Sequence, residues 1–468
     1  MNTTLNTTPR HSTKNEGSIP FTRSTDNQGL TEVCTKAAPK TANRLLVISD
    51  SPTLSTGFAC VSRNLLSYWA AAKKHPGRED RLFEQVDVWG IGYAGWPHNL
   101  PYRLFPAQSY ESPLWHDVRN LSRLAGLIRS QKYTHVWIMQ DLFLLSAEHC
   151  LSTVGAALDS GAKKWGLKSC CYFPVDSLSL EPWERNFIYA CTTGVPYTAH
   201  GLLTIDNGIP ALMSKIVLPV PHGVDTDIFR PIVQFPKRAL REKIFTGVEF
   251  GEDDFLILAV SQHQKRKGLV QTLQVFKRLR EMMPNRVFRL YMHMPSENKS
   301  EGTDLKVVAR NLGLPDVMFG DSTFVGNHAM IDENGLNQLY NAADLLLTTT
   351  YGEGWGLPIT EAMAAGCPVA GPRHTSVAEL LADGRGVLFG TLGDDWIVND
   401  NSRLRPRTDV DDASLQIANA IEAHPESSEC LYANANRAMN WVNGSEFCWE
   451  RIAKHWLSLM GVEQEVSA

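Results

Sequence analysis

Short apolar runs alternate along the first half of the chain with longer stretches in which apolar and polar positions recur at helical spacing. Each run has the length and the β-branched or aromatic content of a buried strand. Strands that alternate with helices are typical of the α/β class, with a parallel, doubly wound sheet. The runs are RLLVISD (44–50), VDVWGIG (86–92), HVWIMQD (135–141), KSCCYFPVD (168–176) and VPYTAH (195–200).

A second series of the same kind follows a proline-rich segment at 210–236, which cannot continue a helix or a central strand. We therefore predict two α/β domains, 43–222 and 223–444. A flexible tail is predicted over 1–42, where large apolar residues are scarce, and an amphipathic helix in 445–468. The second series consists of FLILAVS (255–261), VFRLYMHM (287–294), LLLTTT (345–350), PVAGP (368–372) and GVLF (386–389).

Composition and charge exclude several classes of protein. The 468 residues carry 45 basic and 50 acidic side chains, so no overall positive field is available to gather nucleic acid or anionic lipid. No apolar run approaches the ~18 residues that would span a membrane, and the start MNTTLNTTPRHSTKNEG lacks the apolar stretch of a secretory signal. The nine cysteines are scattered, without a C-x-x-C pair. These features predict a folded protein of the reducing cytoplasm.

The segment TTTYGEGWGLPITEAMAAGCPVAG (348–371) places a glycine-rich turn between a strand and a helix that is predicted to begin at Pro358. Gly354 and Gly356 would let the backbone approach a ligand closely, and the first N–H groups of the helix would face the same point. Glu353 and Glu361 can then accept hydroxyl hydrogens of a sugar or ribose from two sides. The alternative is a tight loop with Glu361 as a helix-dipole carboxylate.

This segment resembles the two-glutamate signature of the retaining GT-B glycosyltransferases of family 4, the group 1 glycosyltransferases, in which seven residues separate the glutamates. The resemblance extends through LNQLYNAADLLL (336–347) and back to PHGVDTDIFRP (221–231). It implies two Rossmann-like domains that face each other across a cleft, with the last helix crossing back to the first domain. It also implies that Glu353 contacts donor-sugar hydroxyls and that Glu361 holds the ribose. The backbone that would support sugar and phosphate is that of Gly354, Trp355, Gly356 and Leu357.

Three cations, Lys265, Arg266 and Lys267, follow the first strand of the second series. Cations at the carboxyl end of a strand can neutralise a diphosphate leaving group, whereas a solvated charged loop is the alternative. By the resemblance, Lys267 matches the lysine that the family places in this loop. The family's usual arginine position holds Gln262, but Arg266 resembles the arginine of a subgroup with adjacent Arg-Lys, so the role is transferred to Arg266.

Two loops after strands of the first series complete the predicted site. SDSPTLSTGFACVSRNLL (49–66) is similar to the family's N-terminal glycine loop, where Gly57 would lie against donor phosphate or acceptor; a simple strand–helix turn is the alternative. YFPVDS (172–177) places Asp176 in a region where many relatives have a histidine that contacts the donor sugar. Asp176 is the candidate replacement, and a turn former after Pro174 is the alternative.

The sequence therefore predicts a glycosyltransferase whose catalytic residues are Glu353, Asp176, Arg266 and Lys267. The predicted co-substrate is a nucleoside-diphosphate sugar, and neither a cofactor nor a metal is predicted. Asp225-Thr226-Asp227 is typical of a turn, and neither His293 nor His328 has a second ligand at metal spacing.

The favoured acceptor is a hydroxyl of a small molecule, a glycan or a lipid-linked sugar. Arg403, Arg405 and Arg407 are expected on an ordinary loop surface, so they do not require a polyanion. Two alternatives stay open: a glycosyltransferase that acts on hydroxymethylated bases in DNA, and a non-catalytic protein that binds nucleotide sugars. The residues specify neither the base and sugar of the donor nor the oligomeric state.

Overall fold

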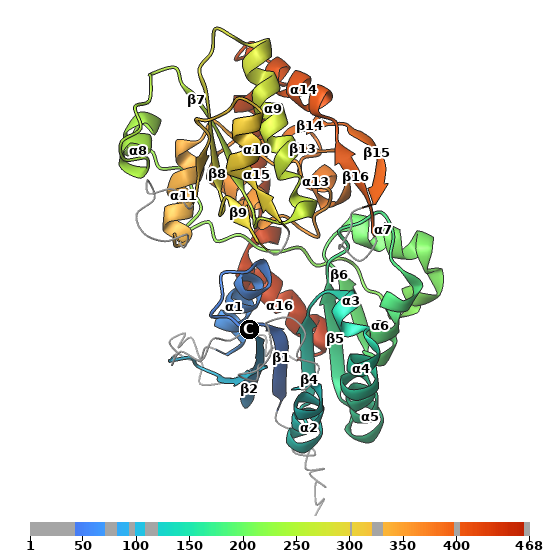
Figure 1. The fold of residues 1–468 in the computed structure, drawn as a ribbon. Helices are drawn as coiled ribbons and strands as arrows, with labels where there is room; N and C mark the ends of the chain where they lie inside the picture. Colours follow the sequence, from blue (N-terminus) through green and yellow to red (C-terminus); the bar gives the residue numbers. More distant parts are fainter. Residues whose placement is uncertain are drawn as a thin grey trace, which may run out of the picture. The chain divides into compact units, whose positions relative to one another are not determined.

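The computed structural model describes residues 43–70, 82–92, 99–107, 120–299, 302–320, 331–396 and 403–462. The predicted tail over 1–42 and His328 lie outside these residues. Ala42–Ala468 form one compact unit, which contains two six-stranded sheets (Figure 1).

The first sheet is parallel and has the strand order β3-β2-β1-β4-β5-β6. Its central strand β1 is buried on both faces: Leu45 and Val47 pack into one core cluster, and Leu46 and Ile48 pack into another. Burial on both faces explains why this strand is a continuous apolar run. The elements, in chain order, are β1 (Arg44–Asp50), α1 (Gly57–Trp69), β2 (Gln85–Ile91), β3 (Arg103–Pro106), α2 (Leu121–Gln131), β4 (His135–Met139), α3 (Leu142–Leu145), α4 (Glu148–Cys150), η2 (Leu151–Gly155), α5 (Ala156–Trp165), β5 (Lys168–Phe173), η3 (Pro182–Arg185), α6 (Asn186–Ala190), β6 (Thr193–Pro196), α7 (Ala199–Gly208) and η4 (Pro210–Lys215).

The second sheet is also parallel, with the order β11-β8-β7-β12-β13-β14. An antiparallel hairpin of β15 and β16 follows its last strand. The elements are α8 (Lys237–Ile244), β7 (Phe255–Val260), η5 (Lys265–Lys267), α9 (Leu269–Met282), β8 (Phe288–His293), β9 (Glu297–Asn298), β10 (Thr303–Asp304), α10 (Leu305–Asn311), β11 (Met318–Phe319), α11 (Glu333–Ala342), β12 (Leu345–Leu347), α12 (Leu357–Ala364), β13 (Val369–Pro372), α13 (Thr375–Leu380), β14 (Val387–Phe389), β15 (Thr391–Trp396), β16 (Leu404–Thr408), α14 (Val410–Glu422), α15 (Leu431–Val442), η6 (Ser445–Phe447) and α16 (Trp449–Met460).

The last helix, α16, returns to the first sheet, as predicted (red in Figure 1). Trp456 is buried and lies with its ring 5.6 Å from that of Trp137 on β4 and 4.9 Å from that of Tyr172 on β5. The indole of Trp69, at the end of α1, donates to the backbone oxygen of Ala453 at 3.2 Å. These contacts and the two parallel sheets confirm the predicted fold class. The boundaries 43–222, 223–444 and 445–468 stay predictions.

Candidate functional site

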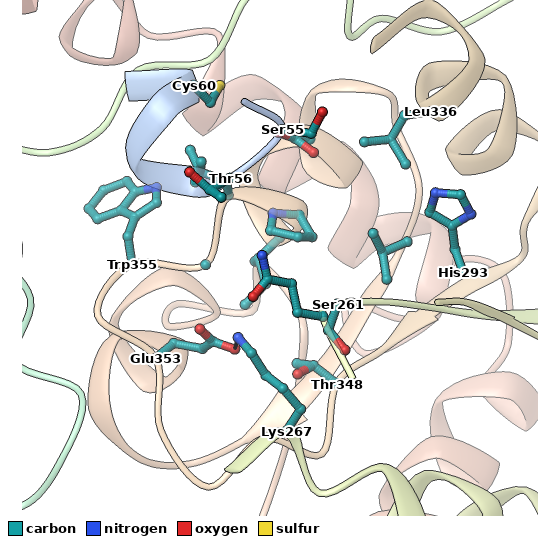
Figure 2. Close-up of a pocket in the computed structure, with 18 of the residues that line it drawn as sticks. Ser55, Thr56, Cys60, Ser261, Lys267, His293, Leu336, Thr348, Glu353 and Trp355 are labelled. Carbon is teal, nitrogen blue, oxygen red and sulfur yellow. Dashed lines mark hydrogen bonds and ion pairs between the residues drawn. The ribbon is translucent and has the colours of Figure 1, made fainter. Parts of the chain in front are cut away.

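A cavity of about 800 Å³ is lined by residues from both halves of the chain. Many of them follow the carboxyl ends of parallel strands, where open α/β sheets bind their ligands. Every residue predicted for the site lines this cavity, and so does Gln262. Figure 2 shows Glu353 and Lys267 pointing toward each other within it. The cavity brings together the predicted residues Gly57, Asp176, Arg266, Lys267, Glu353, Gly354, Trp355, Gly356, Leu357 and Glu361.

The glycine-rich turn leads directly into α12, which begins at Leu357, one residue before the predicted start. Gly356 caps the helix with φ +105°, a conformation that L side chains rarely adopt, and Pro358 lies in the first turn. A Cβ on Gly354 would lie only 2.4 Å from the Cβ of Pro174 in the loop after β5. Gly354 is therefore required by a close contact within the protein, in addition to any approach to a ligand.

Glu353 forms an ion pair with the cation loop after β7. Lys267 Nζ donates to Glu353 Oε1 at 2.6 Å, and Arg266 Nη1 lies 3.6 Å from Glu353 Oε2. Arg266 also donates to the backbone oxygen of Gly352 at 2.8 Å. The Lys267 side chain is only 13% exposed, so a solvated charged loop describes Lys265 alone, which is exposed and does not line the cavity.

The pKa values of both partners are lowered, but for different reasons. Burial lowers the pKa of Lys267 to about 8, the charge of Arg266 adds to the shift, and Glu353 opposes it. Burial alone would raise the pKa of Glu353, but Lys267 and Arg266 outweigh it and hold that pKa below the usual range. Both partners are therefore mainly charged at neutral pH, and the two cations are available to an anionic ligand.

Glu361 lies inside α12 and is buried. Tyr340 on α11 donates its hydroxyl to Glu361 Oε2 at 2.8 Å. Burial raises the pKa of Glu361 to about 7; the hydrogen bond from Tyr340 opposes the shift, and the charge of Glu333 adds to it. Unlike for Glu353, no cation offsets the effect of burial on the pKa of Glu361. It can accept hydroxyl hydrogens from a ligand that enters the cavity.

We expect Glu361→Gln to stabilise the fold at alkaline pH. The folded pKa of about 7 lies above that of an unfolded glutamate, so wild-type stability falls as pH rises between ~4.3 and ~7 and stays reduced above that range. Gln keeps an acceptor for Tyr340 without the buried charge. Urea unfolding measures the free energy of unfolding of the variant minus that of wild type. This difference should be about 1–3 kcal/mol larger at pH 8 than at pH 5. Glu422→Gln on the exposed face of α14 is the control, and the same gain at both pH values would contradict the assignment.

Asp176 is enclosed by arginines from the second half of the chain. Its Oδ1 accepts from Arg403 at 3.1 Å and its Oδ2 from Arg405 at 3.2 Å, while Arg266 lies 3.9 Å from Oδ2. Burial opposes ionisation, yet the three guanidinium groups hold the pKa of Asp176 well below its usual range. Asp176 thus lines the cavity as part of an ion cluster, and a direct contact with the donor sugar stays a prediction.

The expectation that Arg403 and Arg405 belong to an ordinary loop surface is wrong. Arg405 is 2% exposed and Arg403 is 9% exposed. The β15–β16 hairpin positions both side chains against the loop after β5, where Arg403 also donates to Glu184. Arg407, on the same strand, is exposed. The physical reason is pairing: a buried arginine is tolerated because carboxylates from the other half of the chain neutralise it.

Arg405→Met is expected to destabilise the fold, because it removes the nearly fully buried partner of the Asp176 carboxylate. Breaking a buried ion pair typically costs about 3–5 kcal/mol, and the remaining Arg403 and Arg266 should limit the loss to roughly 2 kcal/mol. Urea unfolding at pH 7 measures this difference. Arg407→Met changes the same side chain on the same strand at an exposed position and should shift the midpoint much less. Equal effects of the two substitutions would show that the cluster does not stabilise the fold.

Gly57 begins α1 in the loop after β1. Thr56 caps the helix by accepting from Ala59 N at 3.2 Å and donates its own hydroxyl to Asp50 Oδ2 at 2.6 Å. A Cβ on Gly57 would lie 3.6 Å from Leu357 Cδ1. The loop therefore faces the start of α12, as the predicted site requires.

The lining residues that sequence reasoning missed include Asp50, Asp141, Tyr197 and His222. Asp50 and Asp141 end the runs RLLVISD and HVWIMQD, so their place at the carboxyl ends of strands was a usable signal. Tyr197 and His222 carried none, because an aromatic residue after a strand is as common in a core. Their burial and contacts come only from the folded chain.

The residues considered as metal ligands have other partners. Asp225 Oδ1 accepts from the backbone N–H groups of Asp227 at 3.0 Å and Ile228 at 3.3 Å, which confirms the predicted turn. His293 Nδ1 lies 3.1 Å from Tyr291 Oη. Within the described ranges, no group of three or more His, Cys, Asp and Glu is arranged to hold a metal ion. In the same ranges, no helix has the length and apolar character needed to cross a membrane.

The chain is similar in sequence to known glycosyltransferases. Residues 241–396 match the family model of the group 1 glycosyl transferases. The chain is 35% identical over 180 residues to D-inositol 3-phosphate glycosyltransferase 2 of Catenulispora acidiphila, covering 38% of each protein. It is 26% identical over 254 residues to mannosylfructose-phosphate synthase of Agrobacterium fabrum, covering 53% of this chain and 48% of that protein. The matches thus span less than half the length of these relatives. Over the matched region, the chain resembles the group 1 glycosyl transferases, as the sequence predicted.

Solved structures share the fold over nearly their whole length. Sucrose-phosphate synthase from Thermosynechococcus elongatus matches with a TM-score of 0.63 and 16% identity, covering 89% of this chain and 98% of that one. HepE of Anabaena, solved in complex with UDP and glucose, matches with a TM-score of 0.61 and 16% identity, covering 90% and 99%. At this identity the likeness shows the fold, and it confirms the GT-B architecture.

Proposed function

We propose, from the premise that residues 241–396 belong to the group 1 glycosyl transferases, that this chain transfers a sugar from a nucleoside-diphosphate sugar to an acceptor hydroxyl with retention of configuration. The observation that carries the proposal is the ion pair of Lys267 and Glu353, 2.6 Å apart, beside the N-terminus of α12 in a cavity lined by both halves of the chain. Cations and free backbone N–H groups suit a diphosphate, and carboxylates suit sugar hydroxyls.

The donor is placed along the second half of the chain. Glu361 would accept the ribose hydroxyls, and Glu353 would accept hydroxyls of the transferred sugar. The diphosphate would lie between Lys267, Arg266 and the N-terminus of α12, where positive charge is concentrated. HepE was solved with UDP-glucose, which supports a donor of this class.

Catalysis in this arrangement is mainly electrostatic. The bond between the anomeric carbon and the phosphate oxygen breaks, and the acceptor oxygen forms its bond to the same carbon on the same face. The departing phosphate oxygen takes the acceptor proton, so no side chain has to act as nucleophile or base. Lys267, Arg266 and the α12 dipole stabilise the charge that develops on the leaving diphosphate, and Glu353 fixes the sugar.

A panel of nucleoside-diphosphate sugars tests this function. Purified protein is incubated with each donor and a mixture of hydroxyl-bearing acceptors, and released nucleoside diphosphate is measured. We expect release from one or a few donors and labelled sugar in the acceptor. A protein that binds a nucleotide sugar without turning it over would instead be a non-catalytic binder, which would contradict the proposal.

Turnover is expected to survive chelation of divalent metals. In this proposal Lys267 and Arg266 supply the positive charge that a divalent ion would otherwise supply to the diphosphate. Turnover measured after dialysis against EDTA should stay within about twofold of the untreated rate. Loss of turnover in EDTA, followed by recovery when magnesium or manganese is added back, would show that a metal is required.

A further inference from the structure

The part of the cavity lining that comes from the first half of the chain carries three carboxylates, those of Asp50, Asp141 and Asp176, which we name the acidic wall. We infer that the acidic wall, together with Tyr197, is the acceptor subsite, and that it takes an uncharged polyhydroxyl acceptor, a sugar or polyol without a phosphate group. The inference rests on the proposed function and adds the class of acceptor to it.

The acidic wall is built from the carboxyl ends of three adjacent strands, β1, β4 and β5. Asp176 forms ion pairs with Arg403 and Arg405, whereas Asp50 and Asp141 form none with another described residue. Asp50 accepts from Thr56 at 2.6 Å and from Gln140 at 3.5 Å, both neutral donors. Asp141 precedes α3 without capping it through its side chain. Burial raises the pKa of Asp141 to about 7; the charges of Asp176 and Asp50 add to the shift, and those of Arg403 and Arg266 oppose it.

The cations of the cavity are engaged elsewhere. Among the described lining residues of the first half of the chain, Arg63 is the one basic side chain. It donates to Glu333 at 2.8 Å and to the backbone oxygens of Pro52 and Leu54, each at 3.2 Å. Arg266 and Lys267 face Glu353 and are assigned to the donor, and Arg266 also lies 3.9 Å from Asp176 of the acidic wall. A phosphate on the acceptor would therefore have to compete with Asp176, Glu353 and Glu333 for the cations within reach.

Next to the acidic wall lies a group of buried polar atoms without partners. Within the described part of the chain, Tyr197 Oη, both ring nitrogens of His222 and Trp355 Nε1 have no hydrogen-bond partner. All three side chains line the cavity and are at most 5% exposed. The ring centroids of Tyr197 and His222 are 4.5 Å apart, and those of His222 and Trp355 are 5.4 Å apart. The charges of Asp141 and Asp50 act on the Tyr197 hydroxyl and add to the rise of its pKa that burial causes.

Buried polar atoms are nearly always paired, so this group points to a ligand that supplies the missing hydrogen bonds. A polyol does so in both directions: its hydroxyls donate to Asp141 and Asp50 and accept from Tyr197. A phosphate cannot donate to these two carboxyls, and in their ionised form they repel its charge, so it fits this wall poorly. The relatives named for D-inositol 3-phosphate and mannosylfructose-phosphate bear names of phosphorylated sugars. We place this chain apart from them at the acceptor subsite.

The experiment compares matched acceptors with a donor that the protein turns over. The pairs are glucose and glucose 6-phosphate, fructose and fructose 6-phosphate, and myo-inositol and its 3-phosphate. The non-anionic and anionic fractions of a cell extract are tested with the same labelled donor. We expect label in uncharged acceptors, with kcat/KM at least ~10-fold above the phosphorylated partner. Hydrolysis of the donor by water is measured in parallel.

Two variants test the residues. Tyr197→Phe should raise the acceptor KM at least about fivefold while donor hydrolysis stays within twofold, because one hydrogen bond to the acceptor is lost. Its melting temperature should not fall, since the hydroxyl has no partner to lose. Tyr172→Phe is the matched control, because the Tyr172 hydroxyl donates to Val220 O at 2.7 Å and removal of this hydroxyl should lower the melting temperature.

Asp141→Asn should reduce the discrimination against phosphate about tenfold. Asp159→Asn, at an exposed position, is the control and should leave this discrimination unchanged.

The outcomes separate the inference from the function. Preference for phosphorylated acceptors or for the anionic fraction would overturn the inference and leave the proposed function intact. Donor hydrolysis without label in any acceptor would also overturn it. If no nucleotide sugar is hydrolysed or transferred at all, the proposed function itself has failed.

Discussion

Replacement of Glu353 by Gln is expected to lower kcat at least ~10²-fold, the scale of losing one oriented polar contact at a reacting group. Gln keeps the volume of Glu353 but cannot accept two hydroxyl hydrogens as a carboxylate, and it no longer neutralises Lys267 at 2.6 Å. Loss of this ion pair should also lower the free energy of unfolding of the variant by about 1–3 kcal/mol, because Lys267 is left buried beside a neutral partner.

The rate is measured by release of nucleoside diphosphate at saturating donor, at a temperature where urea unfolding shows that the variant is fully folded. Glu242→Gln is the matched control, since Glu242 forms an exposed ion pair with Arg238 at 2.9 Å on α8, outside the cavity lining. Near-normal turnover of Glu353→Gln would contradict the role assigned to this carboxylate.

Lys267→Met should weaken the binding of the nucleoside diphosphate product about 10- to 100-fold, the value of one hydrogen bond to a charged group. Binding of the bare nucleoside should change less than about twofold, because its partners in our account are the ribose and base contacts around Glu361. Met keeps the length of the buried stem and removes only the charge.

Isothermal titration with both ligands measures the two affinities on one preparation. Lys265→Met is the matched control: it alters the same loop two residues away, at an exposed position outside the cavity lining. An equal loss of affinity for diphosphate and nucleoside in Lys267→Met would show that Lys267 supports the loop rather than the phosphates.

The fold could be predicted from the sequence because its central strands are buried on both faces and appear as apolar runs of five to seven residues, such as β1 and β4. The edge strands β3 and β11 have only four and two residues, too few to form a recognisable run. The β15–β16 hairpin was not predicted, for a different reason. Its strand LRPRT is polar, and its burial depends on partners distant in the sequence.

The candidate site, too, could be predicted only in part. Strand ends converge in an open sheet, so Glu353, Lys267 and Asp176 could be assigned to one cavity from their positions after strands. The pairing of Arg403 with Asp176 joins residues 227 positions apart, and no local pattern marks it. Tyr197 likewise looked like an ordinary core residue. Only the folded chain shows that its hydroxyl has no partner among the described residues.

The anomeric configuration of the released sugar tests the central claim most directly. Hydrolysis of an α-linked nucleoside-diphosphate sugar is followed by ¹H NMR, and the first anomer is recorded before mutarotation. In the proposed transfer, the attacking oxygen lies on the face that the diphosphate leaves, while Lys267 and Arg266 hold that diphosphate. We therefore expect the α anomer as the first product, formed at least ~10²-fold more slowly by Glu353→Gln. Initial release of the β anomer would contradict the proposed retaining transfer.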